Sequence, residues 1–393
     1  MVDDHKDYLP GEAPAAHKVS HQDGGTDEIS LYGLSGESVL LAAHKILPAI
    51  HHVRYSDAEA ISALADLLSA KVSKTTAPWL KTIGSGGDYA TWAAMLAAMP
   101  DLLSHNFKVT IKAGTTLTER CGLFSKRGLT SLGTISVRSE KYFPTTGLLP
   151  TADSATATTL RDAALSAAAL GDDYFNGCWV FINHGTGTDN GFVKITDYID
   201  TTGDVVVASW PGTQPDNTSR YLIVGALINA TSVYSGFDIY YNAAYIKIIG
   251  IGIKDSDGYG MEVFSNLGYF LFKYCGIYNS NYSGIFVRNS QYSELYSDGF
   301  VLNNRRSAGI GAGLRIESDI KTFISYCGIS DNDDQGIYCA SGAYTLAVNN
   351  FGDNNGLWGI KAVDSARVNV DGSECSGSSG NHTNGVGDGS LVY

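Results

Sequence analysis

The amino-acid sequence predicts a mostly β protein whose C-terminal part is a right-handed parallel β-helix of about 23 residues per coil. Three observations predict this fold. A glycine followed by an apolar residue recurs at intervals of 24, 29, 23 and 23 residues between Gly260 and Gly359. Apolar and polar residues alternate within each interval. None of the nine prolines lies beyond Pro215.

The repeat consists of two columns of glycine–apolar pairs, about sixteen residues apart. The first column contains Gly260-Met261, Gly284-Ile285, Gly313-Leu314, Gly336-Ile337 and Gly359-Ile360. The second contains Gly276-Ile277, Gly299-Phe300 and Gly328-Ile329, and Phe351 ends it. The longest interval falls in the same unit of both columns, which predicts one loop insertion at residues 303–312. Units of this size cannot bury an apolar face alone, so stacked units are expected to share one core.

The alternation predicts which residues of each coil face inward. Strands with one buried face place alternate side chains in the core. One further inward column is Val263, Val287, Ile316 and Cys339, and another is Leu271, Leu295, Ile324 and Ala347. Ile248 and Ile253 predict at least one coil before Gly260. Interior strands need every backbone N–H for the ladder, which explains the missing prolines. Asn, Asp and Gly supply the turns.

The N-terminal region has a different composition. Residues 1–36 are polar and lack periodicity, which predicts an extended arm. Residues 37–82 are predicted to be helical, because Ser56–Glu59 matches a helix capping box. A narrow apolar stripe follows at Ile61, Leu64, Leu68 and Val72. The stripe fits a short coiled coil between chains and equally an amphipathic helix packed on its own domain.

Residues 83–150 are predicted to cap the β-helix and to form its first strands. A helix opening at Asp88 and ending before Pro100 would place Trp92, Met95, Leu96 and Met99 on one face, and Phe107, Val109 and Ile111 then alternate as a strand. Residues 151–236 are predicted to contain a linker or helix at Ala152–Ala169, followed by a small β-rich module that interrupts or adjoins the β-helix. Residues 237–393 complete the β-helix and its tail.

Composition excludes some function classes. The chain has 27 Lys and Arg against 40 Asp and Glu, a net charge of −13, which argues against nucleic-acid binding. No secretory signal or membrane span is expected, so synthesis in the cytoplasm without membrane insertion is predicted. The six cysteines form no C-x-x-C pair and are expected to be buried free thiols.

Candidate catalytic and metal-binding residues were sought among the carboxylates and histidines. A glycosidase needs two carboxylates about 5–9.5 Å apart, so a pair must lie in one coil or in neighbouring coils. Asp257 and Asp333 lie too far apart, Asp331 and Asp353 could pair, and Glu317 is expected to form an ion pair with Arg288. In an assembly of several copies, symmetry-related histidines could hold a metal or serve in packing: His5, His17, His21, His44, His51 and His52. No catalytic, cofactor or metal residue is assigned.

Tyrosine is the more informative residue type. Sixteen of 23 tyrosines lie beyond Pro215. A tyrosine ring has a flat apolar face and a polar edge, which suits sugar rings and protein partners alike. Packing between the β-helices of neighbouring copies is the equally weighted alternative. The tyrosines singled out are Tyr259, Tyr278, Tyr282, Tyr292, Tyr296, Tyr326, Tyr338 and Tyr344.

Three segments carry further motifs: His17–Ile29, His51–Ala60, and Asp172–Gly177 with the following Gly185–Gly187, Ile195–Tyr198 and Trp210. In this order they resemble segments of bacteriophage tail-fibre and tail-spike proteins, and the repeat is similar to a pectate-lyase-like β-helix. The resemblance implies a homotrimer, an N-terminal virion-attachment region that contacts tail or baseplate proteins, and a receptor-binding rod. The chain departs from the family in having only a Gly/Ser tail after Cys375.

These observations lead to one functional hypothesis with two alternatives. We expect a tail fibre or tail spike of a virion that binds a host-surface glycan or protein, with trimerisation raising weak affinity at each site. The first alternative is a polysaccharide depolymerase, a hydrolase or lyase, on the same scaffold. The second is an architectural tail connector without receptor binding. Parallel β-helices serve all three roles, so the fold does not choose among them.

Overall fold

The computed structural model describes residues 78–100, 102–103, 105–124, 127–128, 134–144, 149–241, 245–265, 270–289, 295–298, 301–303, 311–318, 321–371, 373–384 and 391–392. All of these belong to one compact unit. The arm predicted for residues 1–36, the apolar stripe predicted within residues 37–82 and the six N-terminal histidines lie outside the described residues.

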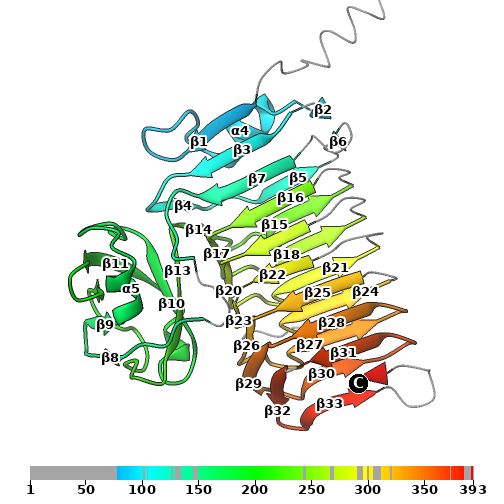
Figure 1. Ribbon diagram of the computed structural model, residues 1–393. Helices are drawn as coiled ribbons and strands as arrows, with labels where there is room; N and C mark the ends of the chain where they lie inside the picture. The colour runs from blue at the N-terminus through cyan, green and yellow to red at the C-terminus, as the bar shows by residue number, and fades with distance from the viewer. Residues whose placement is uncertain are drawn as a thin grey trace, which may run out of the picture. The chain divides into compact units, whose positions relative to one another are not determined.

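Three parallel sheets form a β-helix (Figure 1). Sheet I runs in the order β1 (Trp79–Ile83), β3 (Phe107–Ile111), β7 (Thr134–Ser139), β16 (Tyr245–Ile249), β19 (Phe270–Lys273), β22 (Leu295–Asp298), β25 (Lys321–Ser325), β28 (Tyr344–Val348), β31 (Arg367–Asp371) and β34 (Leu391–Val392). Sheet II runs in the order β4 (Thr115–Leu117), β14 (Ala226–Asn229), β17 (Ile251–Lys254), β20 (Gly276–Tyr278), β23 (Val301–Asn303), β26 (Gly328–Ile329), β29 (Phe351–Asn355) and β32 (Glu374–Gly377).

Sheet III completes each coil. It runs in the order β5 (Cys121–Phe124), β15 (Ser235–Tyr240), β18 (Tyr259–Phe264), β21 (Ile285–Arg288), β24 (Leu314–Glu317), β27 (Ile337–Ala340), β30 (Trp358–Ala362) and β33 (Gly380–Asn384). The chain passes from sheet I to sheet II to sheet III in each coil, and about 10 coils contain about 24 residues each. A separate pair, β2 (Leu102–Leu103) with β6 (Arg127–Gly128), lies outside the three sheets.

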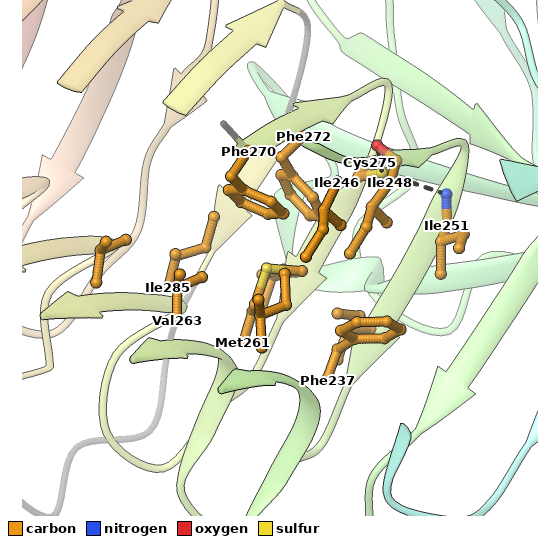
Figure 2. Close-up of a cluster of buried hydrophobic side chains, with 14 of the residues drawn as sticks. Phe237, Ile246, Ile248, Ile251, Met261, Val263, Phe270, Phe272, Cys275 and Ile285 are labelled. Atoms are coloured by element: carbon orange, nitrogen blue, oxygen red, sulfur yellow. Dashed lines mark hydrogen bonds between the residues drawn. The ribbon is translucent and has the colours of Figure 1, made fainter. Parts of the chain in front are cut away.

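The predicted interior column is confirmed. Ile285 pairs with Leu314, Leu314 with Ile337, and Ile337 with Ile360, and all four side chains are fully buried. The second column, Val263, Val287, Ile316 and Cys339, is also in register and buried. Figure 2 shows the same core around Phe237 and Met261, where aromatic, aliphatic and sulfur-containing side chains from neighbouring coils meet.

One predicted column is wrong in its register. Leu271 pairs with Tyr296, and it is Phe270 that lies opposite Leu295. Phe270 and Phe272 are buried, whereas Leu271 between them is only partly buried. Three consecutive apolar residues give no alternation, so the pattern could not select the inward face.

The position of the insertion also differs from the prediction. The residue opposite Gly276 and Gly328 was predicted to be Gly299, but it is Val301. On sheet I, Ser297 is the residue opposite Ile324, where Leu295 was predicted. Part of the insertion therefore precedes β22 and does not fall wholly within residues 303–312.

A helix packs on the first coils. Helix α4 (Trp92–Ala98) begins after Thr91, whose side chain accepts a hydrogen bond from Ala94 N at 3.2 Å. The predicted start at Asp88 is therefore too early. Trp92 is buried in the β-helix core, donates from Nε1 to the Gly122 carbonyl at 3.0 Å, and its ring lies 5.2 Å from that of Phe237.

A small antiparallel module is inserted between β7 and β14 (Figure 1). Its sheet runs in the order β13 (Arg220–Val224), β10 (Trp179–His184), β11 (Phe192–Ile199), β12 (Asp204–Val207), β9 (Thr159–Arg161) and β8 (Ser154–Ala155). Helix α5 (Ala163–Ala167) and the 3-10 turn η3 (Thr188–Asn190) complete it. Strand β14 pairs with β4, and β16 with β7, so the β-helix continues in register across the insertion. Ala152–Ala169, predicted as a linker or helix, therefore contributes two strands and a short helix to the module.

The module contacts the outer face of sheet II through aromatic rings. Phe181 and Phe192 stack with ring centroids 4.7 Å apart, and Tyr278 lies 5.7 Å from Phe181. A Cβ atom added to Gly252 or Gly276 would lie 2.7 Å or 2.9 Å from the Phe192 ring. Glycine at these positions therefore lets the module ring approach the sheet.

The ion pair between Asp204 and Arg161 predicts a pH dependence for the stability of the module. Arg161 donates to both carboxylate oxygens of Asp204, at 2.6 and 2.8 Å. These hydrogen bonds lower the pKa of Asp204, so its contribution to stability is present above the unfolded-state pKa and is lost as the pH falls through the folded-state pKa. Asp204→Asn should therefore unfold at lower urea concentration than the wild type at pH 7, and the difference between the two midpoints should shrink at an acidic pH that approaches the lowered folded-state pKa. Equal differences at both pH values would contradict this.

Candidate functional site

The outer face of sheet III carries two rows of charged and aromatic side chains. In each strand two inward apolar residues flank one outward residue, as Phe237 and Ile239 flank Asp238. The outward residues form a first row along the stack: Asp238, Glu262, Phe286, Arg315, Tyr338 and Lys361. Two residues further along each strand, a second row follows: Phe124, Tyr240, Phe264, Arg288 and Glu317. We call these rows, with the adjoining Arg120, Tyr234, Tyr241, Tyr259 and Tyr282, the sheet III face.

Two buried carboxylates lie opposite each other on neighbouring strands of this face. Asp238 on β15 pairs in register with Glu262 on β18, and both side chains are buried. Asp238 Oδ2 accepts a hydrogen bond from Arg120 Nε, and its Oδ1 is buried without a hydrogen-bond partner among the described residues. Burial raises the pKa of Asp238, although Arg120 opposes the shift.

Glu262 joins the two rows of the face. It accepts hydrogen bonds from the Tyr240 hydroxyl and, at 2.9 Å, from Arg288 Nη2. Burial and the Glu262 carboxylate together raise the pKa of Tyr240, so this hydroxyl stays protonated and keeps donating. The network orients Arg288 and Tyr240 toward the outside of the sheet.

Each arginine of the face lies over aromatic rings. The guanidinium carbon of Arg120 is 5.7 Å from the Phe124 centroid, and that of Arg288 is 4.7 Å from the Phe264 centroid. Arg315 lies 4.8 Å from the Phe286 centroid. These distances fall within the range of cation–π attraction, which holds the planar groups against the rings.

Tyrosines border the start of the same strands. Tyr234, Tyr259 and Tyr282 meet edge-on or tilted, with ring centroids 5.6 to 6.1 Å apart. Tyr241 follows β15 and lies edge-on to Phe264 at 5.3 Å. Tyr234 and Tyr241 are the most exposed aromatic residues of the face.

Among the carboxylates named from the sequence, Glu317 is part of the sheet III face. Asp257 and Asp333 are exposed turn residues, Asp331 adopts the left-handed conformation at a corner, and the Asp353 side chain lies outside the described residues. Glu317 is in register with Arg288, as expected, but it accepts hydrogen bonds from Arg315 on its own strand. Arg288 instead pairs with Glu262 of the preceding coil.

The predicted tyrosines separate into different environments. Tyr259, Tyr282 and Tyr338 belong to the sheet III face. Tyr278 packs against the module, and Tyr344 is exposed on sheet I. The side chains of Tyr292 and Tyr296 lie outside the described residues, and Tyr326 occupies a corner with left-handed backbone geometry.

Sequence reasoning missed Asp238, Glu262 and Arg120. A usable signal existed for the two carboxylates, because each stands between two apolar residues of the interior columns and they are 24 residues apart. Arg120 gave no signal, since it is 118 residues from Asp238 and the module lies between them.

The six cysteines are free and buried, as predicted. In the described ranges, no group of three or more His, Cys, Asp or Glu side chains is arranged to hold a metal ion. Helices long and apolar enough to cross a membrane are absent from the same ranges.

Comparison with known families covers the β-helix. Residues 234–391 match a family model described as a right handed beta helix region. The matched segment begins just before β15 and reaches β34, in agreement with the stacked parallel sheets, and it identifies the hand of the β-helix as right-handed. No curated protein matches the chain.

Proposed function

We propose that the protein is a tail fibre or tail spike of a bacteriophage virion whose β-helix binds a host-surface glycan at the sheet III face. In this proposal the chain forms a homotrimer and its N-terminal region attaches to tail or baseplate proteins. The observation that carries the binding role is the continuous aromatic and arginine surface along successive coils. Aromatic faces stack on the apolar faces of sugar rings, while hydroxyl and guanidinium groups bond their hydroxyls.

The geometry of the β-helix supports this function. Residues at equivalent positions in successive coils repeat about every 4.8 Å along the stack, so the face offers regularly spaced contacts to a linear polymer. Each contact is weak, and three copies in a trimer would raise the total affinity without new contacts.

The most exposed tyrosines of the face provide the test. The double variant Tyr234→Ala with Tyr241→Ala should bind bacteria from a receptive strain about tenfold more weakly than the wild type, because two stacking surfaces are lost. Fluorescently labelled protein and a panel of bacterial strains give the measurement. Tyr344→Ala is the matched control, since this tyrosine is exposed on sheet I.

Two outcomes would contradict the proposal. Equal binding by the double variant and the Tyr344→Ala control would place the receptor site elsewhere. Failure of the wild type to bind any strain would favour the architectural connector.

A second candidate function, cleavage of the bound polysaccharide, is favoured by the Asp238–Glu262 pair. Paired strands lie about 4.8 Å apart, close to the roughly 5–5.5 Å between the two carboxyl groups of retaining glycosidases. An aspartate whose pKa is raised by burial suits proton donation. Release of new reducing ends that stops in Glu262→Gln but continues in Asp257→Asn would establish this function in place of simple binding.

A further inference from the structure

Two arginines of the sheet III face, Arg120 and Arg288, are more exposed than their carboxylate partners. The side chain of Arg120 is 46% exposed and that of its partner Asp238 is 0% exposed. Arg288 is 43% exposed, and its partner Glu262 is 2% exposed. In these two pairs the group that meets an approaching ligand is the cation. In the third pair, Arg315 and Glu317 are 21% and 23% exposed, so both groups reach the surface.

The arginines are also held ready for a second anion. Arg315 donates from Nε to Glu317 at 2.7 Å and also from Nη2 to the same oxygen, while its guanidinium lies between the rings of Phe286 and Tyr338, at 4.8 and 5.7 Å. A guanidinium has five N–H donors, so this pairing leaves donors for another acceptor. Because the two rings and the Glu317 carboxylate already fix the plane of the Arg315 guanidinium, this side chain loses little rotamer entropy when it binds a ligand.

The cations follow the axis of the β-helix. Arg288 and Arg315 lie on neighbouring strands in different rows, a diagonal pair about 7–8 Å apart. Lys361 lies in the same row as Arg315, two strands further along. Arg120 precedes β5, three strands before β21 in sheet III. This local line of cations complements a linear polymer with repeated negative charges.

We propose that the sheet III face binds an acidic polysaccharide, with Arg288 and Arg315 pairing with sugar carboxylates while the adjacent aromatic rings stack on the sugar rings. This inference rests on the proposed glycan-binding function and names the chemical class of the glycan. Polyuronates are the simplest members of this class. Aromatic rings alternating with the arginines distinguish the face from a general anion-binding surface, for which charge alone would suffice.

The test uses the 393-residue chain and two immobilised polyuronates, polygalacturonate and alginate. The wild type should bind at least one of them, and carboxyl-reduced forms of the same polymers should bind about tenfold more weakly or not at all. Affinity should fall as salt concentration rises, because exposed charges are screened. Poly-L-glutamate, a polyanion without sugar rings, should bind poorly.

Arg315→Gln should lower the affinity for the bound polyuronate by about tenfold, a typical effect of losing one charge-assisted contact. Arg315→Lys retains the charge and should restore part of the affinity. Arg161→Gln is the matched control, because Arg161 is an exposed arginine paired with a carboxylate, on the module and away from the face. Far-ultraviolet circular dichroism of each variant separates a binding defect from a folding defect.

The failures are distinguishable. If carboxyl-reduced and native polymers bind equally, or if Arg315→Gln binds like the wild type, the acidic class is wrong while the glycan-binding function stands. If poly-L-glutamate binds as tightly as the polyuronates, the site recognises anions and not sugars. If no polyuronate binds while Tyr234→Ala with Tyr241→Ala still loses attachment to bacteria, the face binds a ligand of another class and the inference is overturned.

Discussion

Replacing Leu314 with alanine should lower the free energy of unfolding by about 2–5 kcal/mol. Leu314 is fully buried between Ile285 and Ile337 in the interior column, so the change removes apolar contacts with the coils on both sides. The surrounding backbone is held by ladder hydrogen bonds in both directions and can collapse into the cavity only partly. Denaturant unfolding followed by far-ultraviolet circular dichroism measures the loss.

Leu80→Ala is the matched control for this change. Leu80 lies on β1 and is 63% exposed, so the same truncation should change stability by less than about 0.5 kcal/mol. Equal destabilisation by both variants would show that the interior column does not supply the stabilising core. Because coils contact only their neighbours, unfolding of Leu314→Ala can begin at its own coil and leave the module folded.

Replacing Gly203 with alanine should destabilise the module by about 2–4 kcal/mol. Gly203 has a φ of +66°, and a Cβ atom there would lie 2.1 Å from the Asp162 carbonyl oxygen and 2.9 Å from Ser166 N. Both contacts are with backbone atoms at the start of α5, so relief requires the helix to move. Thermal unfolding monitored by the fluorescence of Trp179 and Trp210, both in the module, reports on this region.

Gly171→Ala separates backbone strain from collision. Gly171 also has a positive φ, of +88°, but an added Cβ would meet nothing within 4 Å. The free energy of unfolding of this variant should therefore fall only by the cost of placing alanine in a left-handed backbone conformation, about 1–2 kcal/mol. If Gly203→Ala is no more destabilised than Gly171→Ala, collision with the backbone of α5 does not contribute to the loss of stability at Gly203.

The β-helix was predictable because its pattern is local and repetitive. Each coil repeats the spacing of the last, so a single sequence shows which residues are equivalent, and Ile285, Leu314, Ile337 and Ile360 were assigned to one column correctly. The prediction failed where apolar residues are consecutive, as at Phe270–Phe272. There two registers bury similar apolar side chains, and only the packing of the whole stack distinguishes them.

The candidate site was less predictable than the fold. Asp238 and Glu262 could have been recognised from the repeat, since their strand positions are equivalent. Their hydrogen-bond partners could not have been predicted. Arg120 is separated from Asp238 in sequence by the inserted module, and Arg288 forms its ion pair with Glu262 of the preceding coil. Which arginine meets which carboxylate depends on side-chain geometry between coils, and sequence spacing alone does not specify it.

For this protein, the amino-acid sequence alone determined that the C-terminal coils stack as parallel strands, that prolines avoid them and that the cysteines are buried free thiols. These properties depend on the period of the chain and the polarity of each residue, which are local. Tertiary structure alone decided that the module is inserted between β7 and β14, that Tyr278 packs beneath it, and that buried carboxylates turn arginines outward on sheet III. Those features arise where segments distant in sequence meet and exclude water. Such contacts do not recur at a fixed spacing along the chain, so the sequence pattern does not reveal them.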